Sequence, residues 1–260
     1  MNRKEFIRMG MVSGGIVLTS PLNSIASFNE TMKHLNLRRE GNDVLAADVV
    51  IAGGGLGGCA SALSALRNGL NVVLTEETDW IGGQLTQQGV PPDEHQWIET
   101  HGSTQLYRDF RTAIRAYYKR NYPLTEKARA KDLLNPGDSA VSRIAHEPRV
   151  ALAVLYEMFA PYISAKKLTI LLEHKITKAE VNEDQVNSLI ATDTSSKKEI
   201  TLSAPYFVDA TELGDLLPLT GTEFVTGTES KKETGELHAP EKGDAANNQA
   251  FTMCFAIDYR

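Results

Sequence analysis

Cysteine is scarce in this chain, because Cys59 and Cys254 are the only thiols among its 260 residues. Two thiols cannot form a disulfide framework, and they are too few for an iron–sulfur cluster of the usual four-thiolate kind. Positive charge is also in the minority: 27 Lys and Arg stand against 33 Asp and Glu, which gives a formal net charge of −6. This balance argues against a nucleic-acid-binding protein, whose contact surface would be basic.

The N-terminal apolar segment, residues 9–22, is too short and too rich in Gly, Ser and Pro for a transmembrane anchor. It follows a positive leader that contains Arg3, Lys4 and Arg8, and small residues come after it. This order is typical of a cleavable export signal rather than of an ordinary N-terminus, and we place the signal at residues 1–26. We therefore predict a periplasmic or extracellular protein without a stable membrane anchor.

The export route is left open by the sequence. The stretch NRKEFIR resembles a twin-arginine leader in which Lys4 replaces one arginine, and the general secretory route is the alternative. Residues 27–45 are polar and show no clear period, so we predict a linker there. The rest of the chain has an ordinary globular composition, 42% hydrophobic and 23% charged, and is long enough for one large domain or two small ones.

A glycine-rich turn follows the first apolar run of the folded part. Residues 48–52 (DVVIA) form a short β-branched run that favours a strand buried on both faces. Gly53, Gly55 and Gly58 then satisfy the G-x-G-x-x-G pattern, and residues 60–66 continue as a helix with small side chains. The three glycines permit a tight turn, a close approach of pyrophosphate to the backbone, and close packing of the helix on the strand.

An acidic residue completes this unit. Residues 70–75 (LNVVLT) predict a second strand, and Glu76 stands at its end, where a carboxylate can accept both hydroxyls of an adenosine ribose. A glycine-rich turn without a ligand is the simpler alternative. The order of strand, glycines, helix, strand and acid favours dinucleotide binding, with phosphates at the helix N-terminus.

The remainder of the chain does not continue as an NAD-binding domain would, with alternating helices and strands. A helix opened by Glu147 and Pro148 precedes a strand at residues 168–173. Three short strand-like runs follow and predict a β-meander, before a last apolar strand at residues 206–210. The meander disfavours the alternative of an NAD-dependent Rossmann dehydrogenase.

A basic helix is predicted at residues 105–122. Its apolar positions recur at helical spacing, and we expect Arg108, Arg111, Arg115 and Lys119 to form a solvated basic side rather than a binding surface.

The residues just before this helix include four possible metal ligands: Glu94, His95, Glu99 and His101. Their spacing matches no familiar metal site, so a loop of ordinary polar residues is favoured and no metal is expected. His95 is a weak candidate for a catalytic proton donor, because it follows the segment that is predicted to lie beside the cofactor. Cys59, on the helix after the glycines, is better explained by packing.

Three separated segments carry a resemblance to a known family: DVVIAGGGLGGCASA, VVLTEE followed by WIGGQLTQQGVP, and FVDATELGDLLPLTG. Together they resemble the FAD-dependent oxidoreductases with two dinucleotide-binding domains. The likeness is greatest to the branch of heterodisulfide reductase-like flavoproteins, some of whose members carry the label xanthan lyase. It covers residue 46 to about residue 260.

The resemblance implies an extended FAD, bound by an α/β Rossmann-like domain of the glutathione-reductase type with a β-meander. The implied cofactor-binding residues are Gly53, Gly55, Gly58, Glu76, Gly82, Gly83, Gln84, Leu85, Thr86, Gly214 and Asp215. The resemblance further implies that Gln84, Leu85 and Thr86 run beside the flavin ring, and that Asp215 hydrogen-bonds the ribityl or phosphate region. The chain departs from the family at Glu212, where Ala-Thr-Gly is usual.

The resemblance also implies a domain plan. Residues 46–90 and 140–225 form the FAD-binding domain, residues 91–139 a helical insertion or cap, and residues 226–260 the start of a second, incomplete substrate domain. Because family members are usually longer, the chain is expected to be a truncated form.

We therefore predict an exported FAD-dependent oxidoreductase that transfers a hydride between a small-molecule or sugar-like substrate and the flavin. Its electron acceptor and its general acid or base are not defined by the sequence. Residues 91–99 are the first place to expect substrate contacts. A truncated, non-catalytic remnant of such a flavoprotein is the alternative.

Overall fold

The computed structural model describes residues 44–92, 95–251 and 254. The predicted export signal and nearly all of the predicted linker lie outside these residues. Within the described part of the chain, no helix is long and apolar enough to cross a membrane.

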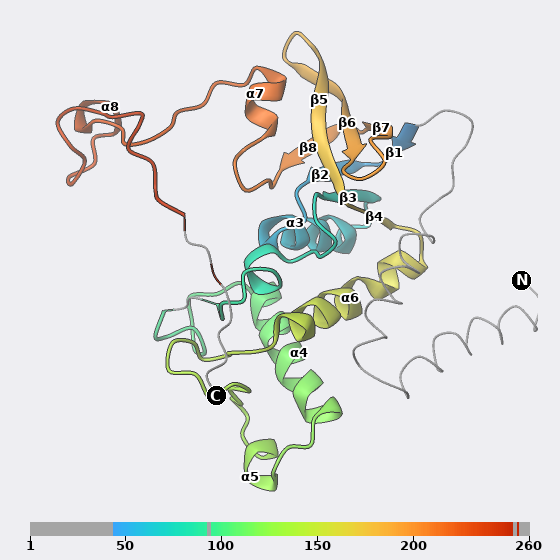
Figure 1. Ribbon diagram of the computed structural model, residues 1–260, viewed down its shortest axis with the longest axis vertical. Coiled ribbons are helices and arrows are strands. Elements are labelled where there is room, and N and C mark those ends of the chain that lie inside the picture. The colour runs from blue at the N-terminus through green and yellow to red at the C-terminus, as the bar shows by residue number, and fades with distance from the viewer. Residues whose placement is uncertain (1–43, 93–94, 252–253, 255–260) are drawn as a thin grey trace, which may run out of the picture.

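A parallel sheet forms the centre of the molecule (Figure 1). Its strand order is β4 (Leu168–Leu172), β3 (Val72–Glu76), β2 (Val49–Ala52) and β8 (Tyr206–Asp209). Every residue of β2 and β3 is buried, which explains why residues 49–52 and 72–74 are continuous apolar runs rather than alternating ones. The central strand β2 pairs with β3 on one side and with the distant β8 on the other.

A second sheet covers one face of the first. It has the order β1 (Val44–Ala46), β7 (Glu199–Ser203), β6 (Gln185–Asp193) and β5 (His174–Asn182). Strands β5, β6 and β7 form the predicted meander, with antiparallel pairing throughout.

The predicted linker, residues 27–45, is wrong at its C-terminal end. Val44 and Leu45 belong to strand β1 and pair in parallel with β7. Main-chain hydrogen bonds to a sheet edge fix this short strand, and its three residues are too few to show a period.

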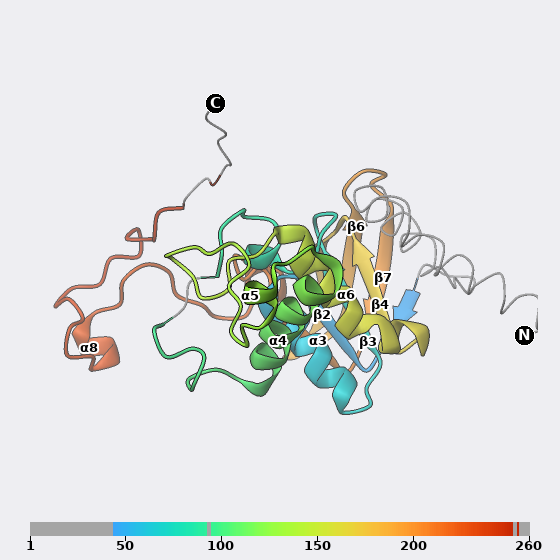
Figure 2. The same cartoon turned by 90° about the horizontal axis from the view of Figure 1, so that it is seen from below.

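Helices cover the other face of the parallel sheet (Figures 1 and 2). The helices that contact the sheet are α3 (Leu56–Arg67) and α6 (Pro148–Ser164), and α4 (Gln105–Asn121) packs on α6. The short α5 (Glu126–Arg129) lies away from the sheet, at the far end of α4 (Figure 1). Alternate residues of the sheet serve the two layers: Ile51 and Leu74 pack among the helices, whereas Val50 and Val73 pack against the meander. The fold is therefore three layered, as the α/β Rossmann-like prediction requires.

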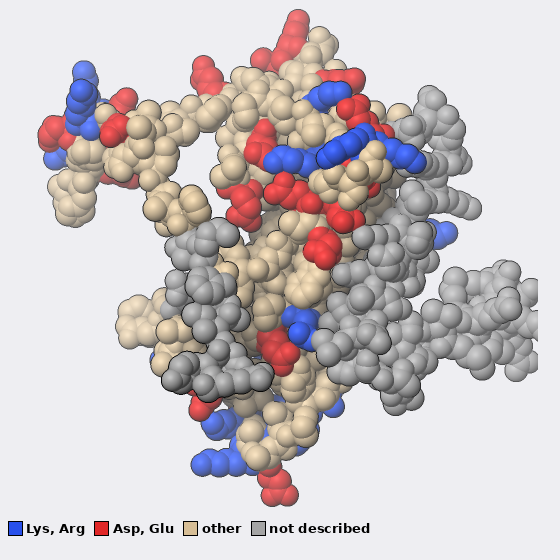
Figure 3. All heavy atoms as spheres, in the orientation of Figure 1, with Lys and Arg blue, Asp and Glu red and all other residues tan. Residues whose placement is uncertain are grey.

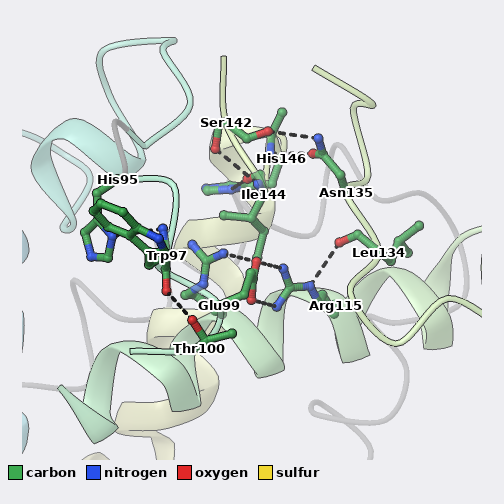
Figure 4. Close-up of polar contacts among 12 residues, drawn as sticks. His95, Trp97, Glu99, Thr100, Arg115, Leu134, Asn135, Ser142, Ile144 and His146 are labelled. Carbon is green, nitrogen blue, oxygen red and sulfur yellow. Dashed lines mark hydrogen bonds and ion pairs between the residues drawn. The ribbon is translucent and has the colours of Figure 1, made fainter. Parts of the chain in front are cut away.

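The predicted solvated basic side of helix α4 is wrong at two positions, Arg111 and Arg115. The side chains of Arg111 and Arg115 are only 2% and 8% exposed, and both form ion pairs with Glu99, which is 16% exposed. Arg115 Nε also donates to the carbonyl oxygen of Leu134 at 3.0 Å (Figure 4). Burial, followed by repulsion from Arg115, lowers the pKa of Arg111 to about 10. The prediction failed here because helical periodicity takes no account of a carboxylate supplied by another segment.

The C-terminal part leaves the layered body after α7 (Leu216–Thr220) and includes the short α8 (Lys231–Thr234) (Figure 1). Phe224, Val225, Leu237 and Phe251 are exposed there. A single bridge between Thr228 and Asp244 is the only β pairing in the described residues of this part. The described residues 247–251 form no strand, and most of the remaining C-terminus lies outside the described residues.

We predict that Glu99→Gln lowers the free energy of unfolding by about 3 kcal/mol, because it removes the carboxylate that pairs with two buried guanidinium groups. Urea denaturation would measure this loss. Glu157→Gln is the matched control: Glu157 pairs with Arg120 at 2.9 Å, but both side chains are about half exposed, so the loss there should stay below about 1 kcal/mol. Equal losses in the two variants would contradict the importance of the buried cluster.

Candidate functional site

The candidate site is a pocket at the carboxyl ends of β2, β3 and β8, where ligands bind in open α/β sheets. Each of these strands is followed by one of the motifs found in the sequence. The pocket is lined by Gly53, Gly55, Thr75, Glu76, Glu77, Thr78, Gly83, Gln87, His174, Lys175, Ile176, Ala210, Thr211, Glu212, Leu213 and Asp215. The fold thus brings together the three segments that carry the family resemblance.

The glycines after β2 allow close backbone contacts. Gly53 has φ +96°, and a Cβ added there would lie 2.3 Å from the carbonyl oxygen of Ala210. A Cβ on Gly58 would lie 1.9 Å from the carbonyl oxygen of Gly53, so only glycine lets α3 pack on the loop. Gly55 differs, because a Cβ there would meet only a Glu212 side-chain oxygen at 3.2 Å. Gly55 therefore presents bare backbone to the pocket, as its predicted role requires.

Helix α3 begins directly at this loop. Gly55 is its N-cap, no side chain caps it, and its first turn holds no acidic residue. The N–H groups of the first turn have no partners within the helix, and they carry the positive end of the helix dipole. This is the arrangement that binds a phosphate group.

Glu76 is held in a fixed position beside the glycines. Its Oε2 accepts from the Gly54 N–H at 3.0 Å, and its Oε1 accepts from the N–H and hydroxyl of Thr78 at 2.9 and 2.7 Å. A carboxylate has about four acceptor sites, so one remains for a ribose hydroxyl. The sequence indicated Glu76 but not Gly54 and Thr78, which hold it.

The segment after β3 turns back onto the glycine loop. Gly82 has φ +106°, and its N–H donates to the carbonyl oxygen of Gly54 at 2.8 Å. A Cβ on Gly83 would lie 3.1 Å from the Gly55 Cα atom. Gly83 therefore lets this segment lie against the backbone of the glycine loop, and the predicted contact of Gly82 and Gly83 with FAD stays a prediction.

The side chains that follow are placed differently from the prediction. Leu85 is buried in the core below the short 3₁₀ helix η2 (Gly83–Leu85), and the hydroxyl of buried Thr86 donates to the carbonyl oxygen of Ile81 at 2.7 Å. Gln84 is exposed and does not line the pocket. Gln87 lines the pocket in their place and donates to the Thr78 hydroxyl at 2.6 Å. A tight turn changes side-chain direction at each residue, which the sequence alone did not resolve.

The loop after β8 forms the opposite wall. Asp209, at the end of the strand, accepts hydrogen bonds from Thr211 and, at 2.9 Å, from the Leu216 N–H. The Asp215 N–H donates to the Thr211 hydroxyl at 2.7 Å, and Gly214 has φ +69°. Asp215 is thereby held at the pocket, where we predicted it, whereas the organising role of Asp209 was not foreseen.

Lys175, at the start of β5, was also missed. Its ammonium lies 3.2 Å from Glu77 and 3.4 Å from Asp215, and the pKa of Lys175 is raised chiefly because Glu77 accepts its hydrogen bond and adds an opposite charge. In the sequence, Lys175 reads as an ordinary outward residue of a meander strand. Charged side chains of both signs gather over this part of the surface (Figure 3).

His95 does not line this pocket. It is exposed, its ring lies 6.2 Å from the Trp97 ring between centroids, and it borders a separate polar hollow near Glu99 (Figure 4). Glu94 lies outside the described residues, and among the described ones no group of three His, Cys, Asp or Glu side chains could hold a metal ion.

Cys59 is buried, as its packing role predicts, and its thiol donates to the carbonyl oxygen of Gly54 at 3.2 Å. Burial, and then the nearby Glu76, raises the pKa of Cys59 to about 12.

The glycine loop after β2, the carboxylate of Glu76 and the uncapped N-terminus of α3 suit an adenine dinucleotide. A sequence model described as FAD dependent oxidoreductase matches residues 48–260. The chain belongs to this family. Its cofactor is FAD, and its fold is the FAD-binding α/β fold. General redox activity is the property that the family shares.

Solved structures of lower similarity share parts of this fold. Sdh1 from Mycobacterium smegmatis in complex with UQ1 is 15% identical with a TM-score of 0.44, and the match covers 64% of this chain and 34% of Sdh1. Glycerol-3-phosphate dehydrogenase from Bacillus halodurans complexed with FAD is 16% identical with a TM-score of 0.41, over 73% and 38% of the two chains. The match thus spans little more than a third of either structure. No curated protein sequence matches the chain.

We predict that Gly55→Val abolishes FAD binding without unfolding the protein. Its φ of −61° is open to any residue, and the added side chain would occupy the side from which the pyrophosphate approaches. Titration of the apoprotein with FAD, followed by flavin fluorescence, would measure the loss, and circular dichroism would verify the fold.

Gly57→Val is the matched control, because a Cβ at Gly57 meets no atom within 4 Å and Gly57 does not line the pocket. This variant should bind FAD as the unmodified protein does. Unchanged FAD affinity in Gly55→Val would show that the glycine pattern has been misinterpreted.

Proposed function

We propose that the protein is an exported flavoprotein oxidoreductase that transfers a hydride between a small-molecule or sugar-like substrate and FAD. The observation that carries this proposal is the convergence of the glycine loop, Glu76, Gly83 and Asp215 on one pocket. We place the chain in the heterodisulfide reductase-like branch, on the three sequence segments that resemble it. We also propose that the protein does not bind nucleic acid, in keeping with its net charge of −6.

The residues of the chain bind and orient the cofactor. Glu76 would accept a hydroxyl of the adenosine ribose, and the loop from Gly53 to Gly58 would receive the pyrophosphate at the N-terminus of α3. Asp215 would accept a hydrogen bond from the ribityl or phosphate region. When bound, FAD supplies the two-electron redox chemistry, and the protein supplies position and electrostatics.

The residues that line the pocket argue against the NAD-dependent alternative. Lys175 from the meander and Asp215 from the loop after β8 both line it, so the meander is part of the binding site and not an appendage. This arrangement supports FAD over NAD, in agreement with the family to which the chain belongs.

A chain that binds FAD without turning over a substrate is the second candidate. The observation that favours it is the position of His95, the weak candidate for a proton donor, outside the cofactor pocket.

We expect the purified protein to carry the visible absorption bands of an oxidised flavin, or to gain them on addition of excess FAD. The bands should bleach with a chemical reductant and, for an active enzyme, with members of a panel of sugars and sugar alcohols. Bleaching by the chemical reductant alone would support the second candidate. A colourless protein that takes up no FAD would contradict both, and parallel titration with NADH tests the NAD-dependent alternative.

The export proposal rests on residues 1–26 and has its own test. Expression of the full chain in a Gram-negative bacterium should give a periplasmic protein whose intact mass lacks residues 1–26. Replacing Arg3, Lys4 and Arg8 by Gln should leave the precursor in the cytoplasm, because the positive leader directs export. A protein that stays full length and cytoplasmic without these changes would rule the signal out.

A further inference from the structure

Glu212, the position at which the chain departs from the family pattern, lines the candidate pocket. It belongs to the loop after β8, where Asp209 and Thr211 fix the backbone on either side of the pocket wall. A Cβ on Gly55 would lie 3.2 Å from Glu212 Oε1, and a Cβ on Gly83 would lie 3.4 Å from the same atom. The carboxylate oxygen therefore stands over the two facing glycines, at the start of α3.

The other acidic residues of the pocket are already engaged. Glu76 accepts three hydrogen bonds from Gly54 and Thr78, while Glu77 and Asp215 both lie beside the ammonium of Lys175. Glu212 differs from them, because no hydrogen bond or ion pair joins its side chain to another of the described residues. What it faces is the uncapped N-terminus of α3, which attracts a negative group.

A pyrophosphate bound in this cradle would need the same space. It must approach Gly55 from the pocket side, since Gly53 and Gly58 are closed by backbone contacts. Two negative groups within a few ångströms of each other repel, so the Glu212 carboxylate opposes a pyrophosphate at this place. The exposed side chain of Glu212 is free to rotate away, whereas the backbone around it is held.

We propose that the Glu212 carboxylate lies in the path of the cofactor pyrophosphate and is displaced when FAD binds. Glu212 is thus a determinant of cofactor affinity, because its negative charge weakens FAD binding. This inference rests on FAD binding in this pocket, as set out under the proposed function.

The test compares FAD affinity of the apoprotein in three forms: unmodified, Glu212→Gln and Glu212→Gly. Glutamine keeps the size and removes the charge, and glycine removes both. We expect the glutamine variant to bind FAD at least about fivefold more tightly, the ratio that follows from modest relief of charge repulsion near the protein surface. The glycine variant should bind at least as tightly, and raising the salt concentration should narrow the difference between Glu and Gln.

A second readout needs no cofactor. Without FAD, Glu212→Gln should unfold at a slightly lower urea concentration than the unmodified protein, because the helix N-terminus loses its negative neighbour. With saturating FAD, the order should reverse, because tighter ligand binding stabilises the folded state more. This change of sign separates a group displaced by the cofactor from one with a purely structural role.

Glu223→Gln is the matched control, because Glu223 is exposed and does not line the pocket. The Glu223→Gln variant should change neither the FAD affinity nor the urea concentration at which the protein unfolds. Equal or weaker FAD binding by Glu212→Gln would overturn the inference while leaving the proposed function intact. If neither the unmodified protein nor any variant bound FAD, the proposed function would fail and the inference with it.

Discussion

The site depends on one steric constraint, the close contact of the loop after β2 with the loop after β8. Gly53 lies against the Ala210 carbonyl, and Gly58 lies against Gly53. These contacts bring the N-terminus of α3 to the edge of the sheet, where its free N–H groups face the pocket. The loop of Gly82 and Gly83 then packs on the same backbone. A side chain at any of these crowded positions would separate the walls of the pocket.

Much of this arrangement could be predicted from the sequence, because it is encoded locally. The buried strands β2 and β3 begin as apolar runs, the glycines follow β2, and Glu76 is the last residue of β3. The start of α6 at Pro148 and the three strands of the meander are likewise set by nearby residues. The resemblance added the pairing of these segments with the loop that holds Asp215, which no local pattern indicates.

What could not be predicted depends on contacts between distant segments. Arg111 and Arg115 read as solvated residues until Glu99 is placed beside them. Lys175 belongs to the pocket only because the start of β5 lies next to Glu77 and Asp215. Leu85 and Thr86 turn into the core because of a single 3₁₀ turn. In each case a side chain's surroundings are set by the three-dimensional path of the chain, and periodicity carries no record of that path.

The pairing of β2 with β8 also sets the order in which the protein can mature. The first wall of the pocket is complete once β3 has formed, but the opposite wall is contributed by a strand that is synthesised much later. Joining such distant segments requires closure of a long loop, which slows folding of parallel sheets. A ligand that contacts both walls can therefore bind fully only after β8 has joined the sheet.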